Sequence, residues 1–531
     1  TTTYIQEMVR GMRAGRAVVV LPLLMMTMES ASAADTRPNF VFLLMDDWGW
    51  GDVGAYAKLV NSGDKPPLTP ELDRLAAEGT IFTRFHTLAS VCSPSRASWL
   101  TGSWPLAVKS PYIFSCSKQA NAAIGQGDYV NTSVPFLPRL LHGHGWRTAH
   151  YGKWHLGCTP DAPAVNAYGF DDSSTYVSNA NNSAQLGNFS TDEWFPANSS
   201  RMIVDHAIDF IAAGGGGGGA ATTEPFYLNL WFHISHAPLN PSPEQLANFT
   251  VEEYCPWSGM VPEHMASNRV YQRCPIQVFR ASQHEADAQV GRLMDVIRGG
   301  AATKDNTLVV MSGDNGPEDP HIYFNSVGSA GGYRGRKRSL YEGGISTPLI
   351  TWWPGTVPAG VVSHGDVASI DWFPTVAALA GVPLDRPTAA WVQGRDASAA
   401  LRGGLLGARA TPLTWDYRFG MPGHCYHQSP RLAILDPSGS GWKLLMNPDR
   451  SRLELYNVTH DLFEATDLSA ENPAVVARLS ARLLAWVDTM PVTPPPKIVL
   501  NAGCNVRGVA VPQAVTPLAD NVWGLSEYEL A

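Results

Sequence analysis

Three short runs that are apolar at every position except Asn229 constrain the fold of this chain more than any other feature of its sequence. They span residues 40–45, 226–232 and 308–311, and each is flanked by helical or loop sequence. A strand that is apolar at every position is buried on both faces, which is typical of a parallel sheet covered by helices. The pattern therefore predicts an α/β domain with a largely parallel sheet.

The helical segments are less sharply marked. The clearest is expected at 282–298, where apolar residues recur at helical spacing from Val290 and the pair Gly299-Gly300 ends the pattern. Six glycines at 214–219 formally satisfy G-x-G-x-x-G, but they follow a helical pattern and precede a strand, the reverse of a dinucleotide-binding turn. We expect a flexible loop there.

The chain of 531 residues exceeds what one hydrophobic core usually serves, so a large domain and a smaller one are expected. After about Thr411 the sequence changes to short strand-like pieces at 442–446 and 453–458, followed by a helix at 473–490. This indicates a small α+β domain. We divide the chain into a signal peptide at 1–34, a large catalytic domain at 35–405, an α+β domain at 406–490 and a proline-rich tail at 491–531.

Residues near the start of the chain predict export. Three arginines within 10–16 precede an apolar stretch at 17–28, and Ala31-Ser32-Ala33 supplies a small-residue cleavage site. The stretch is too short for a comfortable membrane span, and no other segment is apolar over enough residues, so we expect no span in the mature protein. The expected location is the secretory pathway, either extracellular or lysosomal, or the periplasm of a bacterium.

The formal net charge of −9 argues against a nucleic-acid partner, because nucleic-acid binders normally carry a basic face. Any anionic ligand must then be bound by local basic groups. Two such groups are Lys153 with His155 and the run Arg334-Gly335-Arg336-Lys337-Arg338. From charge alone, that run is expected to be a solvated loop.

The chain has seven cysteines, so at least one cannot form a disulfide within the chain. It contains no C-x-x-C motif, so the sequence gives no support for a zinc site. The other six could form up to three disulfides, and we favour only the local pair Cys255 and Cys274. Six N-x-[ST] sequons are compatible with a secreted glycoprotein. They begin at Asn131, Asn181, Asn188, Asn198, Asn248 and Asn457.

Oxygen-bearing side chains follow two of the predicted strands. Asp46-Asp47 ends the first apolar run, and Asp314-Asn315-Gly316 follows the run at 308–311. Strand carboxyl ends form the binding crevice of open α/β sheets. Carboxylates brought together there would repel one another, and a hard divalent cation would stabilise them. Taken singly, Asp46-Asp47 is better explained as a helix cap and Asp-Asn-Gly as a hairpin turn.

Cys92 is predicted at the first turn of a helix. Pro94 suits the start of a helix, which continues to Thr101-Gly102. The positive helix end and Arg96 would lower the pKa of the thiol and favour nearby anions. By composition alone, a half-buried or disulfide-bonded cysteine is the more common alternative.

These residues lie in motifs that resemble those of the type I sulfatase family. Residues 92–102 resemble its C-x-P-S-R-x-x-x-L-T-G signature, and 145–148 leading into 152–157 resemble its second signature. Further similar runs occur in the family's order within about Pro38 to Pro374, at 46–52, 235–238, 312–316, 334–337 and 341–344. The resemblance implies an alkaline-phosphatase-like fold: a large mixed, mostly parallel sheet flanked by helices, plus a smaller C-terminal α+β domain with a short antiparallel sheet.

The resemblance also implies the chemistry. Cys92 is expected to be oxidised to formylglycine by a formylglycine-generating enzyme and hydrated to a gem-diol, of which one hydroxyl attacks sulfur and the other allows sulfate to leave. The implied cofactor is Ca²⁺, with Mg²⁺ as an alternative, and its ligands are Asp46, Asp47, Asp314 and Asn315. The other implied roles are Arg96 holding the formylglycine, Lys153 and Lys337 binding sulfate oxygens, His236 binding substrate and protonating the leaving alcohol, and His155 deprotonating the second hydroxyl.

We therefore expect a sulfuric ester hydrolase acting on a sulfated sugar or polysaccharide, with aryl sulfates as artificial substrates. The run at 334–340 resembles arylsulfatase B and the N-acetylgalactosamine sulfatases. The alternatives are a phosphodiesterase or phosphonate hydrolase of the same superfamily, and a non-catalytic binder of sulfated glycans. The choice of substrate depends on loops such as 173–200, 254–274 and 415–427. The sequence does not specify an oligomeric state.

Overall fold

The computed structural model describes residues 37–60, 66–176, 195–216, 224–250, 274–319, 327–421 and 425–490. The predicted signal peptide and the proline-rich tail lie outside these residues, and so do parts of the three predicted substrate loops. The two main sheets belong to a single compact unit of the chain. The predicted boundary between residues 405 and 406 remains a prediction.

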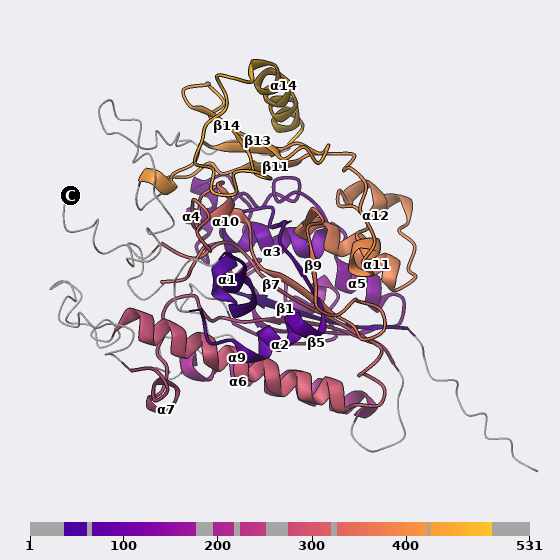
Figure 1. Ribbon diagram of the computed structural model, residues 1–531. Helices are drawn as coiled ribbons and strands as arrows, with labels where there is room; N and C mark the ends of the chain where they lie inside the picture. The colour runs from indigo at the N-terminus through magenta and orange to yellow at the C-terminus, as the bar shows by residue number, and fades with distance from the viewer. Residues whose placement is uncertain are drawn as a thin grey trace, which may run out of the picture. The chain divides into compact units, whose positions relative to one another are not determined.

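The large domain is built on an eight-stranded sheet (Figure 1). Its strands, in order across the sheet, are β5 (Asp172–Tyr176), β4 (Arg147–Lys153), β6 (Phe226–Trp231), β1 (Asn39–Met45), β7 (Thr307–Gly313), β8 (Leu349–Trp352), β2 (Thr80–Phe82) and β9 (Val361–Ser363). Pairing is parallel from β5 to β7 and between β2 and β9, whereas β8 is antiparallel to both its neighbours. The sheet is mixed and mostly parallel, as predicted.

Strand β1 shows why the apolar runs form central strands. Val41 and Leu43 face one hydrophobic core, and Phe40 and Phe42 face another, so both faces of the strand are buried. The first core is closed by helices α2 (Pro70–Glu78), α6 (Phe195–Ile211) and α9 (Pro275–Gly299). The second is closed by α3 (Cys92–Thr101), α5 (Leu137–His142) and α11 (Trp372–Leu379). In Figure 1, α6 and α9 lie on one side of the sheet and α3, α5 and α11 on the other.

Two predicted segments differ from the structure. Helix α9 begins at Pro275, seven residues before the predicted start, because Pro275 suits the first turn and the buried side chains of Ile276 and Phe279 extend the apolar face. The glycines expected to form a loop instead begin as helix, since α6 continues as a π-helical turn over Ala212–Gly216. A Cβ atom at Gly214 would contact the guanidinium of Arg147, so a larger residue would require that side chain to move.

The C-terminal domain contains a four-stranded antiparallel sheet of β11 (Leu413–Asp416), β12 (Leu432–Leu435), β13 (Trp442–Met446) and β14 (Leu453–Asn457). Helix α14 (Pro473–Thr489) covers one face through Leu479 and Leu483. The other face packs on the large domain, where Trp415 and Leu445 share a core with Tyr341. This confirms the predicted α+β domain, although the sequence patterns had not revealed β11 and β12.

Shorter elements complete the described part of the chain. They are η1 (Trp50–Asp52), α1 (Gly54–Val60), β3 (Phe85–His86), α4 (Lys118–Ala123), η2 (Val165–Tyr168), α7 (Pro243–Leu246), α10 (Glu342–Ile345), β10 (Val367–Ala368), η5 (Ser369–Asp371), α12 (Arg386–Trp391), α13 (Ser398–Leu401) and η6 (Cys425–His427). Strands β3 and β10 form a separate parallel pair. Among the described helices, none combines the length and the apolar character needed to cross a bilayer.

Candidate functional site

Adjacent strands bring the predicted acidic residues together. Asp46 and Asp47 follow β1, and Asp314 and Asn315 follow its parallel neighbour β7. The backbone N–H of Asp47 donates to Asp314 Oδ1 at 3.1 Å. Potential ligand atoms of the three aspartates and of Cys92 all lie within 4.8 Å of one another, and all four residues are buried. The helix-cap and hairpin explanations therefore fail, because tertiary structure joins the two motifs.

Cys92 is the first residue of α3 and the free cysteine among the described residues. Its Sγ donates to Asp46 Oδ1 at 3.5 Å and accepts from Lys153 Nζ at 3.4 Å. The predicted lowering of the thiol pKa is wrong. Burial raises the pKa, and this effect together with the charges of Asp314 and Asp46 outweighs the opposing charges of Lys153 and Lys337.

Arg96 lies one turn further along α3 and is completely buried. Its Nη2 lies 2.7 Å from Asp314 Oδ2 and 3.4 Å from Asp46 Oδ1, so one guanidinium bridges the two strand ends. The guanidinium also lies over the ring of Trp231, with 5.0 Å between Cζ and the ring centroid. These contacts fix the first turn of α3, and with it Cys92, against the acidic residues.

Two lysines supply cations from opposite sides of the site. Lys153, the last residue of β4, forms an ion pair with Asp46. Lys337, in the loop before α10, lies 2.7 Å from Asp47 Oδ1 and 3.4 Å from Glu318 Oε2. Although burial opposes the charge of Lys337, Asp47 and other anions raise its pKa well above the usual value.

The basic run that contains Lys337 is not the solvated loop expected from charge. Arg334 lies over the rings of Tyr341 and Tyr426, at 3.9 and 4.6 Å from their centroids. Arg336 donates to backbone carbonyls, and Arg338 pairs with Glu318. The basic run can be buried because each of its cations has an anionic, carbonyl or aromatic partner inside the fold.

Both predicted catalytic histidines are buried at the site. His155 follows β4 with a φ of +56°, and neither of its ring nitrogens has a hydrogen-bond partner among the described residues. His236 Nε2 lies 4.0 Å from Asp47 Oδ2. Burial, followed by the charge of Lys153, holds the pKa of each imidazole well below its ordinary value. Both rings are therefore neutral near pH 7 and can accept a proton.

Sequence reasoning missed two residues that the fold brings to the site. His233 forms a second group with Asp46 and His236, in which potential ligand atoms again lie within 4.8 Å of one another. Glu318 contacts Lys337. The signals were present, since His233 and His236 form an H-x-x-H pattern and Glu318 follows Asp314 by four residues.

The donor set fits a hard divalent cation. Asp46, Asp47, Asp314 and Asn315 offer oxygen atoms only, which calcium and magnesium prefer. Asn315 Nδ2 donates to Asp47 Oδ1 at 2.7 Å, whereas the buried Asn315 Oδ1 has no hydrogen-bond partner among the described residues. A cation would use that oxygen.

Formal charges at the site balance without a metal. The carboxylates of Asp46, Asp47, Asp314 and Glu318 face the cations of Arg96, Lys153, Lys337 and Arg338. A bound divalent cation would leave the site positive, which suits an anionic substrate.

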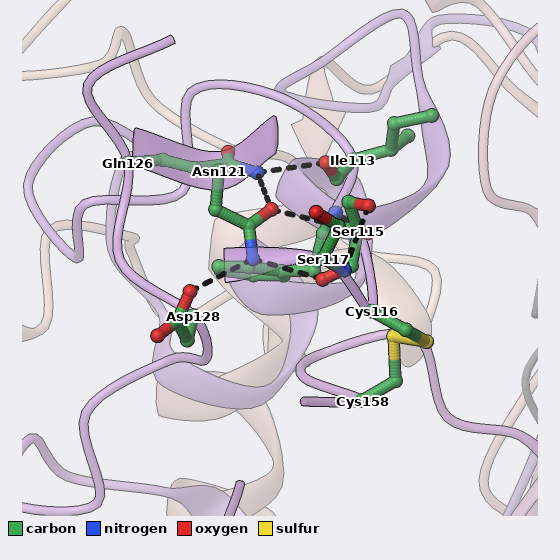
Figure 2. The surroundings of a disulfide bond; sticks show 10 residues. Ile113, Ser115, Cys116, Ser117, Asn121, Gln126, Asp128 and Cys158 are labelled. Atoms are coloured by element: carbon green, nitrogen blue, oxygen red, sulfur yellow. Dashed lines mark hydrogen bonds between the residues drawn. A yellow bond between two sulfur atoms is a disulfide. The ribbon is translucent and has the colours of Figure 1, made fainter. Parts of the chain in front are cut away.

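A disulfide joins Cys116 to Cys158, three residues after His155 (Figure 2). Beside it, Asn121 bonds to both Ser115 backbone groups and to Asp128. The disulfide links the segment after β4 to the loop before α4. Cys274 and Cys425 are also disulfide-bonded. The predicted pair of Cys255 with Cys274 is not tested, because Cys255 lies outside the described residues.

Comparisons with known proteins cover most of the chain. A sequence profile described as Sulfatase matches residues 38–382. N-acetylgalactosamine-6-sulfatase of Sus scrofa is 31% identical over 402 residues, covering 71% of this chain and 68% of that protein. Arylsulfatase A of Homo sapiens is 29% identical over 410 residues, covering 72% of this chain and 71% of that protein.

Solved structures show the same fold. A sulfatase from Pseudoalteromonas sp. matches with a TM-score of 0.64 at 21% identity, over 87% of this chain and 92% of that chain. A second structure, solved in complex with its substrate D-glucosamine-2-N,6-O-disulfate, matches with a TM-score of 0.60 at 19% identity, over 87% of this chain and 100% of that chain. The alkaline-phosphatase-like fold predicted from the sequence motifs is thereby confirmed.

Proposed function

This chain belongs to the sulfatase family, and we propose that it hydrolyses a sulfate ester of a sulfated carbohydrate, with aryl sulfates as artificial substrates. The observation that carries the proposal is the position of Cys92, which begins a helix and contacts both Asp46 and Lys153. A sulfated sugar is supported by the names of the galactosamine-sulfatase relatives and by the disulfated glucosamine bound to a structural neighbour.

We propose that Cys92 is the precursor of formylglycine. Once hydrated, this group would supply one hydroxyl to attack sulfur and a second to expel sulfate. The proposal is supported by the thiol itself, which is buried and free among the described residues and contacts charged groups. Arg96 then holds residue 92 in place through its contacts with Asp314 and Asp46.

Asp46, Asp47, Asp314 and Asn315 are the proposed ligands of Ca²⁺, with Mg²⁺ as the alternative. The ion would polarise a sulfate oxygen and orient the nucleophile. Lys153 and Lys337 reach the same cluster from β4 and from the loop before α10, so their ammonium groups can bind the remaining sulfate oxygens.

The two histidines would act as the base and the acid of the reaction. His155 is neutral and unbonded at both ring nitrogens, which suits a base that accepts the proton of the second hydroxyl. His236 must carry a proton to protonate the leaving alcohol. The negative charge of a bound sulfate ester would favour protonation of its ring, so we propose that the substrate itself prepares this acid.

The cysteines support a proposal about the compartment. The disulfide between Cys116 and Cys158 and the bonded Cys274 and Cys425 are typical of an oxidising environment. Together with the predicted signal peptide, they support secretion or lysosomal delivery, with a formylglycine-generating enzyme acting during maturation. The sequons at Asn131 and Asn248 are exposed, as glycosylation requires.

The direct test is the mass of the peptide that contains residue 92. We expect natively produced protein to yield a peptide about 18 Da lighter than one with cysteine. Active protein with an unmodified thiol would disprove the formylglycine mechanism. In parallel, Lys337→Ala should lower kcat/KM for an aryl sulfate by about 10²- to 10³-fold while the protein stays folded.

One observation favours a second candidate, a phosphodiesterase or phosphonate hydrolase. His233 and His236 could hold a second metal with Asp46, and a pair of metals is typical of phosphoryl-transfer enzymes. Elemental analysis and paired assays on sulfate and phosphate esters separate the two functions. One calcium per chain and faster sulfate release are expected, whereas two metals and faster phosphate release would favour the second candidate.

A further inference from the structure

Glu318 is a buried carboxylate at the site to which the sulfatase mechanism assigns no role. Only 2% of the residue is exposed. Its side chain contacts two consecutive cations. Glu318 Oε2 lies 3.4 Å from Lys337 Nζ and 3.1 Å from Arg338 Nη2, and Oε1 pairs with Arg338 Nη1.

The backbone is arranged to bring both cations onto this carboxylate. Neighbouring side chains usually diverge, but Arg338 has a left-handed φ of +77°, a conformation that is uncommon for arginine. The Lys337 N–H donates to Pro317 O at 2.8 Å, and the Arg338 N–H donates to Ser90 O at 2.8 Å. The basic loop is thus fastened to the segment that follows Asp314 and to the chain just before Cys92.

Glu318 offsets the repulsion between two neighbouring cations. Lys337 and Arg338 are adjacent, largely buried cations that would repel each other without a shared anion. At present Lys337 also binds Asp47. Under the proposed function Asp47 is a metal ligand, so among the described residues Glu318 is the other carboxylate that can hold the ammonium in place.

We propose that Glu318 is a positioning residue that holds the Lys337 ammonium against the sulfate group of the substrate. The inference rests on the proposed function, since it requires Lys337 to bind sulfate oxygens. It adds a requirement of this chain's own: when Asp47 serves as a metal ligand, the Lys337 ammonium depends on Glu318 for its position.

A double-mutant cycle tests the proposal, with Glu318→Gln, Lys337→Met and the double variant. We expect Glu318→Gln alone to lower kcat/KM for an aryl sulfate by about 10- to 100-fold. In the Lys337→Met background the same change should alter kcat/KM by less than about twofold, because the group that Glu318 positions is gone. Titration calorimetry with inorganic sulfate should show weaker binding by Glu318→Gln, independent of turnover.

Glu454→Gln is the matched control. Glu454 is also a buried carboxylate, and it pairs with Arg452 of the C-terminal domain and with Arg334 of the large domain, so its loss should lower the Tm without changing kcat/KM. If Glu318→Gln does not fold, Glu318→Asp retains the charge and should give a smaller loss. Additive effects in the cycle, or unchanged sulfate affinity, would overturn the positioning role. A wild-type protein that releases no sulfate would instead overturn the proposed function.

Discussion

Among the clusters of buried charge in the described part of the chain, two share much of their chemistry. The catalytic cluster consists of Asp46, Asp47, Cys92, Arg96, Lys153, Asp314 and Lys337. The bracing cluster consists of His86, Glu342, Lys443 and Glu464. In the bracing cluster, Lys443 Nζ lies 2.7 Å from Glu342 Oε1 and 2.9 Å from Glu464 Oε1, and His86 Nε2 lies 2.9 Å from Glu342 Oε2.

The two clusters differ in what their charges join. The bracing cluster links β3 and α10 of the large domain to β13 and the turn after β14, so it fastens the C-terminal sheet. The catalytic cluster joins four residues at strand ends, Asp46, Asp47, Lys153 and Asp314, to α3 and to the loop that contains Lys337. Beside it, the ring nitrogens of His155 and Asn315 Oδ1 have no hydrogen-bond partner among the described residues. Burial of charge therefore does not identify an active site. In the bracing cluster, His86 Nδ1 and Glu464 Oε1 also lack a hydrogen bond among the described residues, but each faces an opposite charge, at 3.7 Å from Asp366 and 2.9 Å from Lys443. Buried polar atoms that have neither kind of partner are more informative.

The largest expected effect concerns Cys92. Cys92→Ala should reduce kcat for an aryl sulfate on the order of 10⁴-fold, because the precursor of the nucleophile is removed. The Tm should change little. Ser98→Ala, on the same helix but away from the acidic residues, should retain kcat within about twofold. Residual turnover within tenfold of wild type would show that residue 92 is not the nucleophile.

Lys443→Met should lower the stability of the fold and leave the activity unchanged, the reverse of what is expected for Cys92→Ala. It leaves Glu342 and Glu464 buried without their shared cation, so we expect the free energy of unfolding to fall by about 3–5 kcal/mol. In the folded protein, kcat/KM at low temperature should stay within about twofold of wild type. Urea denaturation and steady-state kinetics on the same samples check both expectations. Loss of activity without loss of stability would contradict the division into two clusters.

The bracing cluster also predicts a pH dependence of stability. Burial opposes charging of His86, but Glu342 and Asp366 raise its pKa to about 9. A raised histidine pKa stabilises the fold fully below the unfolded value near 6.5, and this stabilisation is lost as the pH rises to about 9. The His86 contribution is about 3 kcal/mol.

Urea denaturation between pH 6 and 9.5 measures this contribution. His86→Gln should remove that part of the pH dependence, because glutamine does not titrate. If the free energy of unfolding of the variant changes with pH as steeply as that of wild type, the pH dependence belongs to other groups.

Removal of the divalent cation should have a smaller effect, confined to the catalytic cluster. A cation present at about 100 times its Kd stabilises the folded state by about 2.7 kcal/mol, so a chelator should lower the Tm and abolish turnover, both reversed by added calcium. Asp314→Asn should be insensitive to the chelator, whereas Lys443→Met should respond as wild type does. A chelator response that survives in Asp314→Asn would place the cation elsewhere.

Sequence patterns predicted the catalytic cluster better than the bracing cluster. The acidic pairs, Cys92 and the two lysines stand in short motifs next to apolar runs, and the strand ends that follow such runs converge in a parallel sheet. Glu342 lies in a recognised motif, yet its partner Lys443 is a single lysine about a hundred residues away. No local pattern marks such a pairing, because it exists only where two domains meet.

The sequence of neighbouring residues determined the central strands and the helix that begins at Cys92, because apolar runs and helix-start residues are local patterns. The proposed metal ligands Asp46, Asp47, Asp314 and Asn315 came from strand-end acids together with the resemblance to the sulfatase family. Only the tertiary structure decided the state of the charged groups. It raised the thiol pKa, buried the basic run and gave Lys337 its partner Glu318. These properties depend on burial and on charges from distant segments, and both are established only when the chain is folded.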